Sequence, residues 1–498
     1  MSNIGNQKTI NLALKGFSWS VFGNLIRAIA GFATNIFLAR LLGPEPFGVV
    51  AFALLVISVC NLIIEFGLAS ALVQQEEIEN QDIAFAFTIQ LTLSIFFTII
   101  VFLLAPWISL QFGNESATPV IHVMSIILVL QVFAQVPSAL LRREMKFKQL
   151  QIGQVVSFFV GFVFVGVPLA LLGHGVWSLV IATIIQFGLN ALIVLIAARH
   201  SLAISFKGSR KLTLFGIRTL FANIANWIIQ NIDSAIVGRK FGTTNLGYYN
   251  RAYQLNWAPT GIFLASAQQS LFSAISRMGK STGTIKIFRG FMSVFSIFFF
   301  SAYCLIALES KNIIQLIYGI EWLPSAALLA PLALAMPFYI LVGLEGPVLN
   351  GLGKPEMEMR AQWITAIFAV VVLIVASTIS LEVAAWSILV IYIFRLVMMS
   401  VMTVKALTMT WFELFKPIFI GIVMGIVTLL IWSLINLFVP GNLSSWLIFT
   451  IRSVFTLSLC ILIFWIGRSW FFVDFPLSEI LKALARNSNA NTDMDHNA

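Results

Sequence analysis

Residues 20–48 read SVFGNLIRAIAGFATNIFLARLLGPEPFG, and residues 219–247 read TLFANIANWIIQNIDSAIVGRKFGTTNLG. In the first stretch, polar or small residues recur at steps of four, three, four and three, and the second stretch repeats these steps 199 positions later. The pairs are Ser20 and Thr219, Asn24 and Asn223, Arg27 and Asn226, Gly31 and Gln230, and Thr34 and Asp233. Such steps place residues on one face of an α-helix. The sequence therefore predicts an internal repeat with a polar helix face in each half.

The register between the two stretches continues past the predicted helix ends. The further pairs are Arg40 and Arg239, Gly43 and Gly242, and Gly48 and Gly247. A charge at the centre of a bilayer costs about 2.5 to 3.5 kcal/mol on insertion scales, so Arg27 is expected to face a bundle interior or a watery cavity. Two polar helices at matching positions of a duplicated membrane protein indicate a transporter with a polar cavity between its halves.

The composition excludes an ordinary soluble protein. Hydrophobic residues make up 59% of the 498 residues and charged residues 10%, whereas soluble domains carry about 25% charged residues. The net charge of +10 does not predict nucleic-acid binding, because the basic residues lie in loops between apolar segments. Cys60, Cys304 and Cys460 fall in separate apolar runs and the four histidines show no ligand spacing, so no metal site and no cofactor are expected.

Apolar runs separated by polar, Gly or Pro breaks predict an all-α polytopic membrane protein with about 14 transmembrane helices. The predicted spans are residues 17–38, 47–71, 84–110, 119–141, 151–172, 175–198, 213–238, 246–275, 287–308, 322–350, 359–380, 383–408, 416–439 and 445–468. The connections between them are too short to hold a soluble domain, so the function is expected to lie within the membrane.

Alternate loops carry most of the positive charge. Of the 30 Lys and Arg residues, 21 lie on one side, in loops 142–148, 199–211, 277–289, 354–360, 405–416 and 468–486 together with Lys8 and Lys15. The other side holds Arg40, Arg239, Lys240, Arg251 and Lys311. Because cytoplasmic loops are enriched in Lys and Arg, both termini are predicted to be cytoplasmic.

The repeat and the spans together predict five segments. Residues 1–198 form an N-terminal six-helix lobe, residues 199–212 a cytoplasmic linker, and residues 213–408 a second six-helix lobe. Residues 409–470 form two additional transmembrane helices, and residues 471–498 a cytoplasmic tail. Each lobe has an even number of spans, so both lobes start on the same side of the membrane and the repeats are parallel.

Several stretches resemble bacterial polysaccharide exporters of the Wzx type. They are GFSWSVFGNLIRAIAGFATNIFLARLLGPEPFGVVAFA at 16–53, EFGLASALVQ at 65–74, LLRREMKF at 140–147 and GRKFGTTNLGYYNRAYQL at 238–255. These exporters belong to the MOP superfamily, together with the MATE multidrug transporters and the lipid II flippases, and the subgroup that the chain most resembles includes the colanic acid and teichuronic acid exporters. The resemblance implies a MATE-like fold and alternating access.

The resemblance also implies a function in exopolysaccharide or lipopolysaccharide biosynthesis. The protein would be a flippase that moves an undecaprenyl-pyrophosphate-linked oligosaccharide repeat unit from the cytoplasmic to the periplasmic leaflet of a bacterial inner membrane. The expected partners are this lipid-linked oligosaccharide, membrane lipids, and the polysaccharide polymerase and export machinery. The alternative is a cation-coupled multidrug or small-molecule antiporter of the same fold, although a basic cavity residue favours an anionic substrate. An enzyme is not expected, because a membrane glycosyltransferase or polymerase would show a large periplasmic loop or a carboxylate-rich catalytic segment.

A buried pyrophosphate needs cationic partners, and the planar multi-donor group of arginine suits phosphate. The substrate-site candidates are Arg27, Asn24, Thr34, Asn223, Asn226, Gln230 and Arg251, and the coupling-ion candidates are Glu65, Asp233 and Glu345. Structural ion pairs are the alternative for four of these charged residues. The alternative pairs are Arg27 with Glu65, Asp233 with Arg239, and Glu345 with Arg395.

Overall fold

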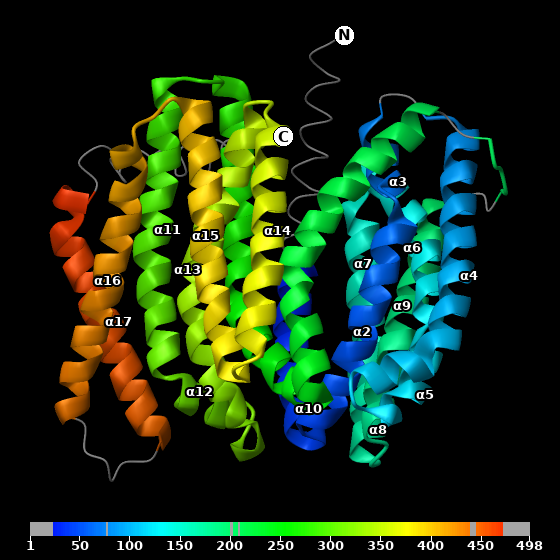
Figure 1. Ribbon diagram of the computed structural model, residues 1–498, viewed down its shortest axis with the longest axis horizontal. Helices are drawn as coiled ribbons and strands as arrows, with labels where there is room; N and C mark the ends of the chain where they lie inside the picture. Colours follow the sequence, from blue (N-terminus) through cyan, green and yellow to red (C-terminus); the bar gives the residue numbers. More distant parts are fainter. Residues whose placement is uncertain (1–22, 76–77, 200–202, 208–209, 439–444, 472–498) are drawn as a thin grey trace, which may run out of the picture. The chain divides into compact units, whose positions relative to one another are not determined.

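The computed structural model describes residues 23–75, 78–199, 203–207, 210–438 and 445–471 (Figure 1). Every regular element in these ranges is a helix. In chain order they are Gly23–Leu42, α2 (Pro44–Glu65), α3 (Leu68–Gln74), α4 (Asn80–Gln111), η1 (Glu115–Ala117), α5 (Thr118–Met124), α6 (Ile126–Arg143), α7 (Phe147–Phe158), the π-helix η2 (Phe159–Gly166), α8 (Val167–Leu171), α9 (Val176–Ala198), α10 (Arg210–Met278), α11 (Thr282–Leu308), α12 (Ser310–Ile317), η3 (Ile320–Trp322), α13 (Pro324–Gly351), α14 (Pro355–Ser377), α15 (Leu381–Leu407), α16 (Trp411–Phe438) and α17 (Ser445–Phe471).

Within the described ranges, 11 helical stretches are long and apolar enough to cross a membrane. They correspond to 11 of the predicted spans. The predicted spans 213–238 and 246–275 both fall in α10, which breaks at Gly242, and 445–468 falls in α17. The count of about 14 spans therefore stays a prediction. The start of the first predicted span and almost all of the predicted tail lie outside the described residues.

The chain forms two compact units. Unit 1 comprises Met1–Gln254, Ile317–Ser325 and Ala369–Ala384, and unit 2 comprises Leu255–Leu316, Ala326–Phe368 and Ala385–Ala498. Unit 1 thus holds the first half of the sequence repeat together with the polar stripe of the second half. The units are defined by spatial contact and the predicted lobes by sequence, and the bounds of the lobes stay a prediction.

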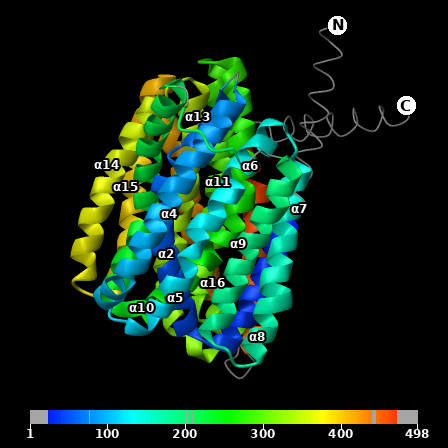
Figure 2. The same cartoon turned by 90° about the vertical axis from the view of Figure 1, so that its right-hand side faces the viewer.

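In unit 1, α6 packs against α4 and α9 (Figures 1 and 2). Leu128, Val132 and Val136 recur every four residues on α6 and are completely buried, as expected for one face of a helix. The π-helix η2 also approaches α9 closely: a Cβ atom at Gly161 would lie 2.6 Å from the carbonyl oxygen of Ala182. Glycine is required there because the two backbones nearly touch.

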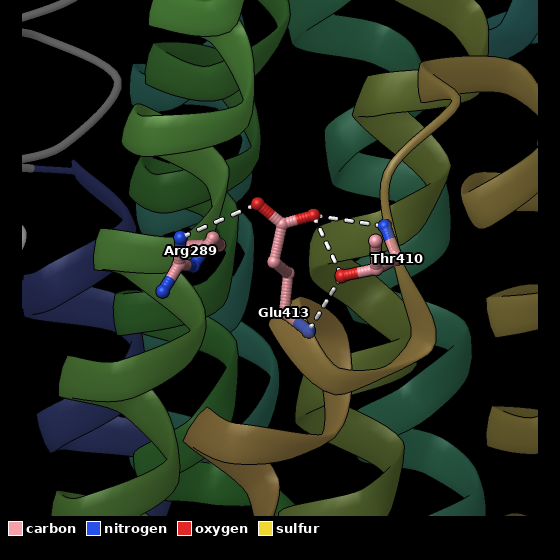
Figure 3. Close-up of polar contacts among 3 residues, drawn as sticks. All are labelled: Arg289, Thr410 and Glu413. Carbon is pink, nitrogen blue, oxygen red and sulfur yellow. Dashed lines mark hydrogen bonds and ion pairs between the residues drawn. The ribbon is translucent and has the colours of Figure 1, made fainter.

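In unit 2, α16 lies along α11, and α17 packs against α16 (Figure 1). Glu413 joins α16 to α11 at one end, where its Oε1 lies 3.6 Å from Nη1 of Arg289 (Figure 3). Its Oε2 accepts hydrogen bonds of 2.8 and 2.9 Å from the backbone N–H and hydroxyl of Thr410, which precedes the first residue of α16. The Thr410 hydroxyl in turn accepts a bond from the Glu413 N–H, so the two residues cap the start of the helix reciprocally.

A second polar cluster joins the other end of α11 to α16 and α17. Glu309 is 1% exposed, and its Oε1 accepts a hydrogen bond of 2.7 Å from Nε1 of Trp432 on α16. The same oxygen lies 4.0 Å from Nη1 of Arg452 on α17. The Arg452 guanidinium also lies 5.6 Å from the centre of the Trp432 ring, a distance that permits a cation–π contact. The two additional C-terminal helices are therefore fixed to unit 2 by buried charge as well as by apolar packing.

Two glycines at matching positions of the repeat share an uncommon backbone conformation. Gly43, between the first helix and α2, has φ 71° and ψ −176°. Gly242, at the break in α10, has φ 84° and ψ 173°. This region of backbone space is accessible almost only to glycine. The sequence repeat thus coincides with a repeated local turn.

Candidate functional site

The polar stripe of the first helix is unevenly exposed. Asn24 is exposed, Arg27 is half-buried, and Thr34 is buried. Gly31 faces α7, because a Cβ atom there would lie 3.8 Å from the ring of Phe158. Among the described residues, Arg27 forms no ion pair with Glu65. The predicted alternative of a structural Arg27–Glu65 pair is therefore not observed in this state.

The matching stripe on α10 is also unevenly exposed, but its exposure does not fall steadily along the helix. Asn223 and Asn226 are half-buried, Gln230 is exposed, and Asp233 is buried. Asp233 Oδ2 accepts a hydrogen bond of 2.7 Å from the Tyr249 hydroxyl. Its Oδ1 accepts one of 2.6 Å from the next backbone N–H. No Asp233–Arg239 ion pair occurs in the described part of the chain, so a phenol and a backbone N–H take the place of the alternative partner.

A polar face of α2 lies against both repeats. Ser58 accepts a hydrogen bond of 3.1 Å from Nε1 of Trp227 on α10. Asn61 accepts one of 2.8 Å from Nε2 of Gln135 on α6. Glu65, at the end of the same face, is half-buried. Trp227 and Gln135 were not predicted from the sequence, because neither lies on a repeated polar stripe.

Arg251 is buried, and several groups hold its guanidinium. Nη1 donates hydrogen bonds of 3.2 Å to Asn35 Oδ1 and 2.7 Å to Gln254 Oε1. The guanidinium carbon lies 3.9 Å from the centre of the Phe47 ring, a cation–π distance. The phenol of Tyr318 lies beside the same guanidinium. Arg251 thus connects the first helix, α2, α10 and the turn after α12.

Tyr318 stays uncharged beside this guanidinium at ordinary pH. Burial raises the pKa of its phenol, and the neighbouring Arg251 opposes that rise without reversing it. The positive charge of Arg251 is therefore solvated by neutral oxygens and an aromatic face, and no anion pairs with it among the residues that the structure describes. Asn35 was not predicted as a site residue. The only sequence signal for it is its position next to the predicted stripe residue Thr34.

Glu345 in α13 is completely buried in unit 2. Its Oε1 accepts a hydrogen bond of 2.8 Å from the Ser400 hydroxyl of α15, and its Oε2 has no hydrogen-bond partner in the described part of the chain. Arg395, also on α15, donates from Nη2 to Gln362 Oε1 at 2.8 Å, and its Nε and Nη1 lack such partners there. Glu345 and Arg395 are not paired among the described residues, contrary to the predicted alternative.

The fold is that of the flippases and multidrug exporters. The structure matches "Lipid II flippase MurJ, inward closed conformation" with a TM-score of 0.72 and 14% identity, covering 91% of this chain and 99% of that chain. It also matches an inward-facing "multidrug resistance MATE family transporter of the MOP superfamily" with a TM-score of 0.53 and 16% identity, over 79% and 97% of the two chains. At these identities the likeness establishes the fold, and it confirms the predicted all-α polytopic membrane protein.

The chain belongs to the polysaccharide biosynthesis protein family, whose model matches residues 37–327. It is 30% identical over 279 residues to "Succinoglycan biosynthesis transport protein ExoT" of Rhizobium meliloti, which covers 55% of each protein. It is 23% identical over 325 residues to "Lipopolysaccharide biosynthesis protein WzxC" of Escherichia coli, which covers 64% of each. The chain therefore matches less than two thirds of the length of these two relatives. The resemblance to Wzx-type exporters is confirmed.

Proposed function

We propose that this protein is a flippase for polysaccharide biosynthesis. It moves an undecaprenyl-pyrophosphate-linked oligosaccharide from the cytoplasmic to the periplasmic leaflet of a bacterial inner membrane by alternating access. The observation that carries the proposal is membership of the polysaccharide biosynthesis family, supported by a relative that is itself named a transport protein. The MurJ-like fold supplies a scaffold compatible with this task. The chain acts as a transporter and not as an enzyme.

The charge of the substrate explains the polar stripes. A pyrophosphate that leaves the aqueous head-group layer loses solvation, so it needs fixed positive partners and hydrogen-bond donors. Arg27 is half-buried in the first helix and has no ion pair with Glu65, so its guanidinium is not neutralised there. In this proposal Arg27 binds the pyrophosphate first. The neutral stripe residues Asn24, Thr34, Asn223, Asn226 and Gln230 line the path.

Arg251 acts at a later step of the same path. Two side-chain oxygens, a phenol and an aromatic ring already hold its guanidinium in this state. None of these partners is an anion, so a pyrophosphate would be a better partner than any of them. In this proposal Arg251 meets the substrate only after its present contacts open, on the periplasmic side of the membrane.

In this proposal the carboxyl groups of Glu65, Asp233 and Glu345 take part in coupling to an ion. Glu345 is the strongest of the three, because a buried and unpartnered Oε2 is costly as part of a charged carboxylate and cheaper as part of a neutral acid. A proton is the ion that such a group takes up and releases most directly. Asp233 accepts two hydrogen bonds, and they stabilise its charged form.

The proposed topology follows from the distribution of charge. About 14 spans place both termini in the cytoplasm, with residues 1–198 and 213–408 as parallel six-helix lobes joined by the linker 199–212. The helices in 409–470 and the tail 471–498 follow. The proposed partners are the lipid-linked oligosaccharide, membrane lipids, and the polymerase and export machinery that would consume the product.

Purified protein in proteoliposomes tests the function. The substrate is a fluorescent undecaprenyl-pyrophosphate-linked oligosaccharide, and its leaflet is read by quenching from outside. We expect the protein to speed equilibration between the leaflets, and Arg27→Ala to abolish the gain. A parallel assay offers a cationic dye with an imposed proton gradient. Dye accumulation without lipid movement would overturn the flippase function in favour of the antiporter.

A further inference from the structure

The two repeats cross each other at a pair of glycines. Gly48 lies near the start of α2, and Gly247 lies 199 positions later, just after the break in α10. A Cβ atom on Gly48 would lie 1.8 Å from the Thr243 carbonyl oxygen, and one on Gly247 would lie 2.3 Å from the Pro44 carbonyl oxygen. Neither position can carry a side chain without moving the opposite backbone.

The crossing has the symmetry of the sequence repeat. Pro44 and Thr243 are themselves 199 positions apart, as are Gly48 and Gly247. The two contacts are therefore equivalent: Gly48 packs against the Thr243 carbonyl, and Gly247 packs against the Pro44 carbonyl. The Cβ position of each glycine also lies 3.1 or 3.2 Å from the backbone nitrogen of the other glycine. Such a self-complementary contact lies on the axis that relates the two repeats. In a parallel duplication this axis runs along the membrane normal.

Polar contacts surround the crossing. Trp322 Nε1 donates a hydrogen bond of 3.0 Å to the Ala39 carbonyl, and Arg40 Nε donates one of 2.8 Å to the Ile317 carbonyl. Asn114 Nδ2 donates one of 2.6 Å to the Thr243 hydroxyl. The Arg251 contacts to the first helix and α2 lie on the same segments of the chain. Water can replace such hydrogen bonds when the segments separate, so their loss costs little net free energy.

We propose that the Gly48–Gly247 crossing is the closure of the transport path on the periplasmic face, and that it separates when substrate is released. This inference rests on the flippase function and topology proposed above. A backbone contact on the repeat axis is lost completely when the two repeats move apart at that face. A contact far from the axis involves only part of each repeat. The surrounding polar contacts, including those of Arg251, break with the crossing and free the guanidinium for the pyrophosphate.

Cross-linking tests whether the closure must open. Cys60, Cys304 and Cys460 are replaced by Ala, and Asn114→Cys/Thr243→Cys is joined by a short, reducible thiol cross-linker. We expect movement of the fluorescent lipid in proteoliposomes to stop on cross-linking and to recover on reduction. The matched control is Asn61→Cys/Gln135→Cys, a hydrogen-bonded pair within the first repeat, which should stay active when cross-linked.

Glycine substitution tests the closure without any transport assay. Thr34→Cys, a buried stripe position, reports access for an impermeant thiol reagent added to intact cells. Adding Gly48→Ala should raise its labelling at least about tenfold, because a minor open state populated at roughly 10% or less becomes the main one. Gly188→Ala is the control, since its Cβ atom would lie 3.8 Å from Leu130 and fits without movement.

The outcomes separate the two proposals. Full lipid movement by the cross-linked 114–243 pair overturns the closure, as does unchanged Thr34→Cys labelling in a Gly48→Ala protein of normal abundance. If Gly48→Ala fails to accumulate, the cross-linking arm decides alone. A parent protein that moves no lipid at all overturns the flippase function, and the labelling arm then still decides whether the crossing opens.

Discussion

Arg27 carries the sharpest prediction at the scale of single residues. Replacing it with Ala should abolish polysaccharide export while leaving the amount of protein in the membrane near normal, because the structure shows no ion pair with Glu65 that its loss would break. Arg27→Lys should recover part of the export, since it keeps the charge but loses the planar fork. Export and abundance are measured together in a deletion strain that carries each variant.

The double variant Arg27→Ala/Glu65→Ala is the control for this prediction. A structural pair that forms in another state of the transport cycle would make each single variant scarce, because breaking a buried pair costs about 3 to 5 kcal/mol. The double variant would then regain both abundance and export. Recovery of export in the double variant would exclude a role for Arg27 in binding substrate.

At the scale of a helix, the stripe predicts a pattern of chemical access. Single cysteines at Asn24, Asn223 and Gln230 should react with a water-soluble thiol reagent, because these positions line the proposed path. Cysteines at Ile29 and Ile228 should not react. Ile29 is 62% exposed, but on a transmembrane helix that exposure faces lipid. Equal reactivity of both sets would remove the functional meaning of the stripe.

Much of the helical organisation followed from the sequence, and the reason is local. Hydropathy over about 20 residues identifies a span without reference to its neighbours. The break in α10 was predictable because Gly242 aligns with Gly43. The contacts of the charged residues were not predictable in this way. Asn35 and Arg251 are 216 positions apart. Helical periodicity predicts only the face of its own helix on which each residue lies, and not the partner on another helix.

At the scale of the whole molecule, the charge asymmetry predicts topology. Reporter fusions at Asn114 and Gly441 should read periplasmic, and one at Gly208 cytoplasmic, because the basic loops lie on the other side from the first two positions. Activity of paired alkaline phosphatase and fluorescent protein fusions measures this directly. A cytoplasmic signal at Asn114 would invert the membrane orientation and would move the proposed closure to the cytoplasmic face.

The buried Glu309–Arg452 contact has a consequence for how the protein is made. Glu309 emerges from the ribosome well before Arg452, so this carboxyl group lies in the membrane without its cation until α17 has been inserted. In the meantime, Trp432 can satisfy only part of the hydrogen-bonding capacity of the Glu309 carboxyl group. We expect Arg452→Ala to leave synthesis unchanged and to shorten the lifetime of the finished chain in pulse–chase labelling. The matched control Arg40→Ala, at an exposed arginine, should not shorten it. Insertion of α17 would then be the step after which the membrane's proteases no longer recognise Glu309 as an unpaired buried charge.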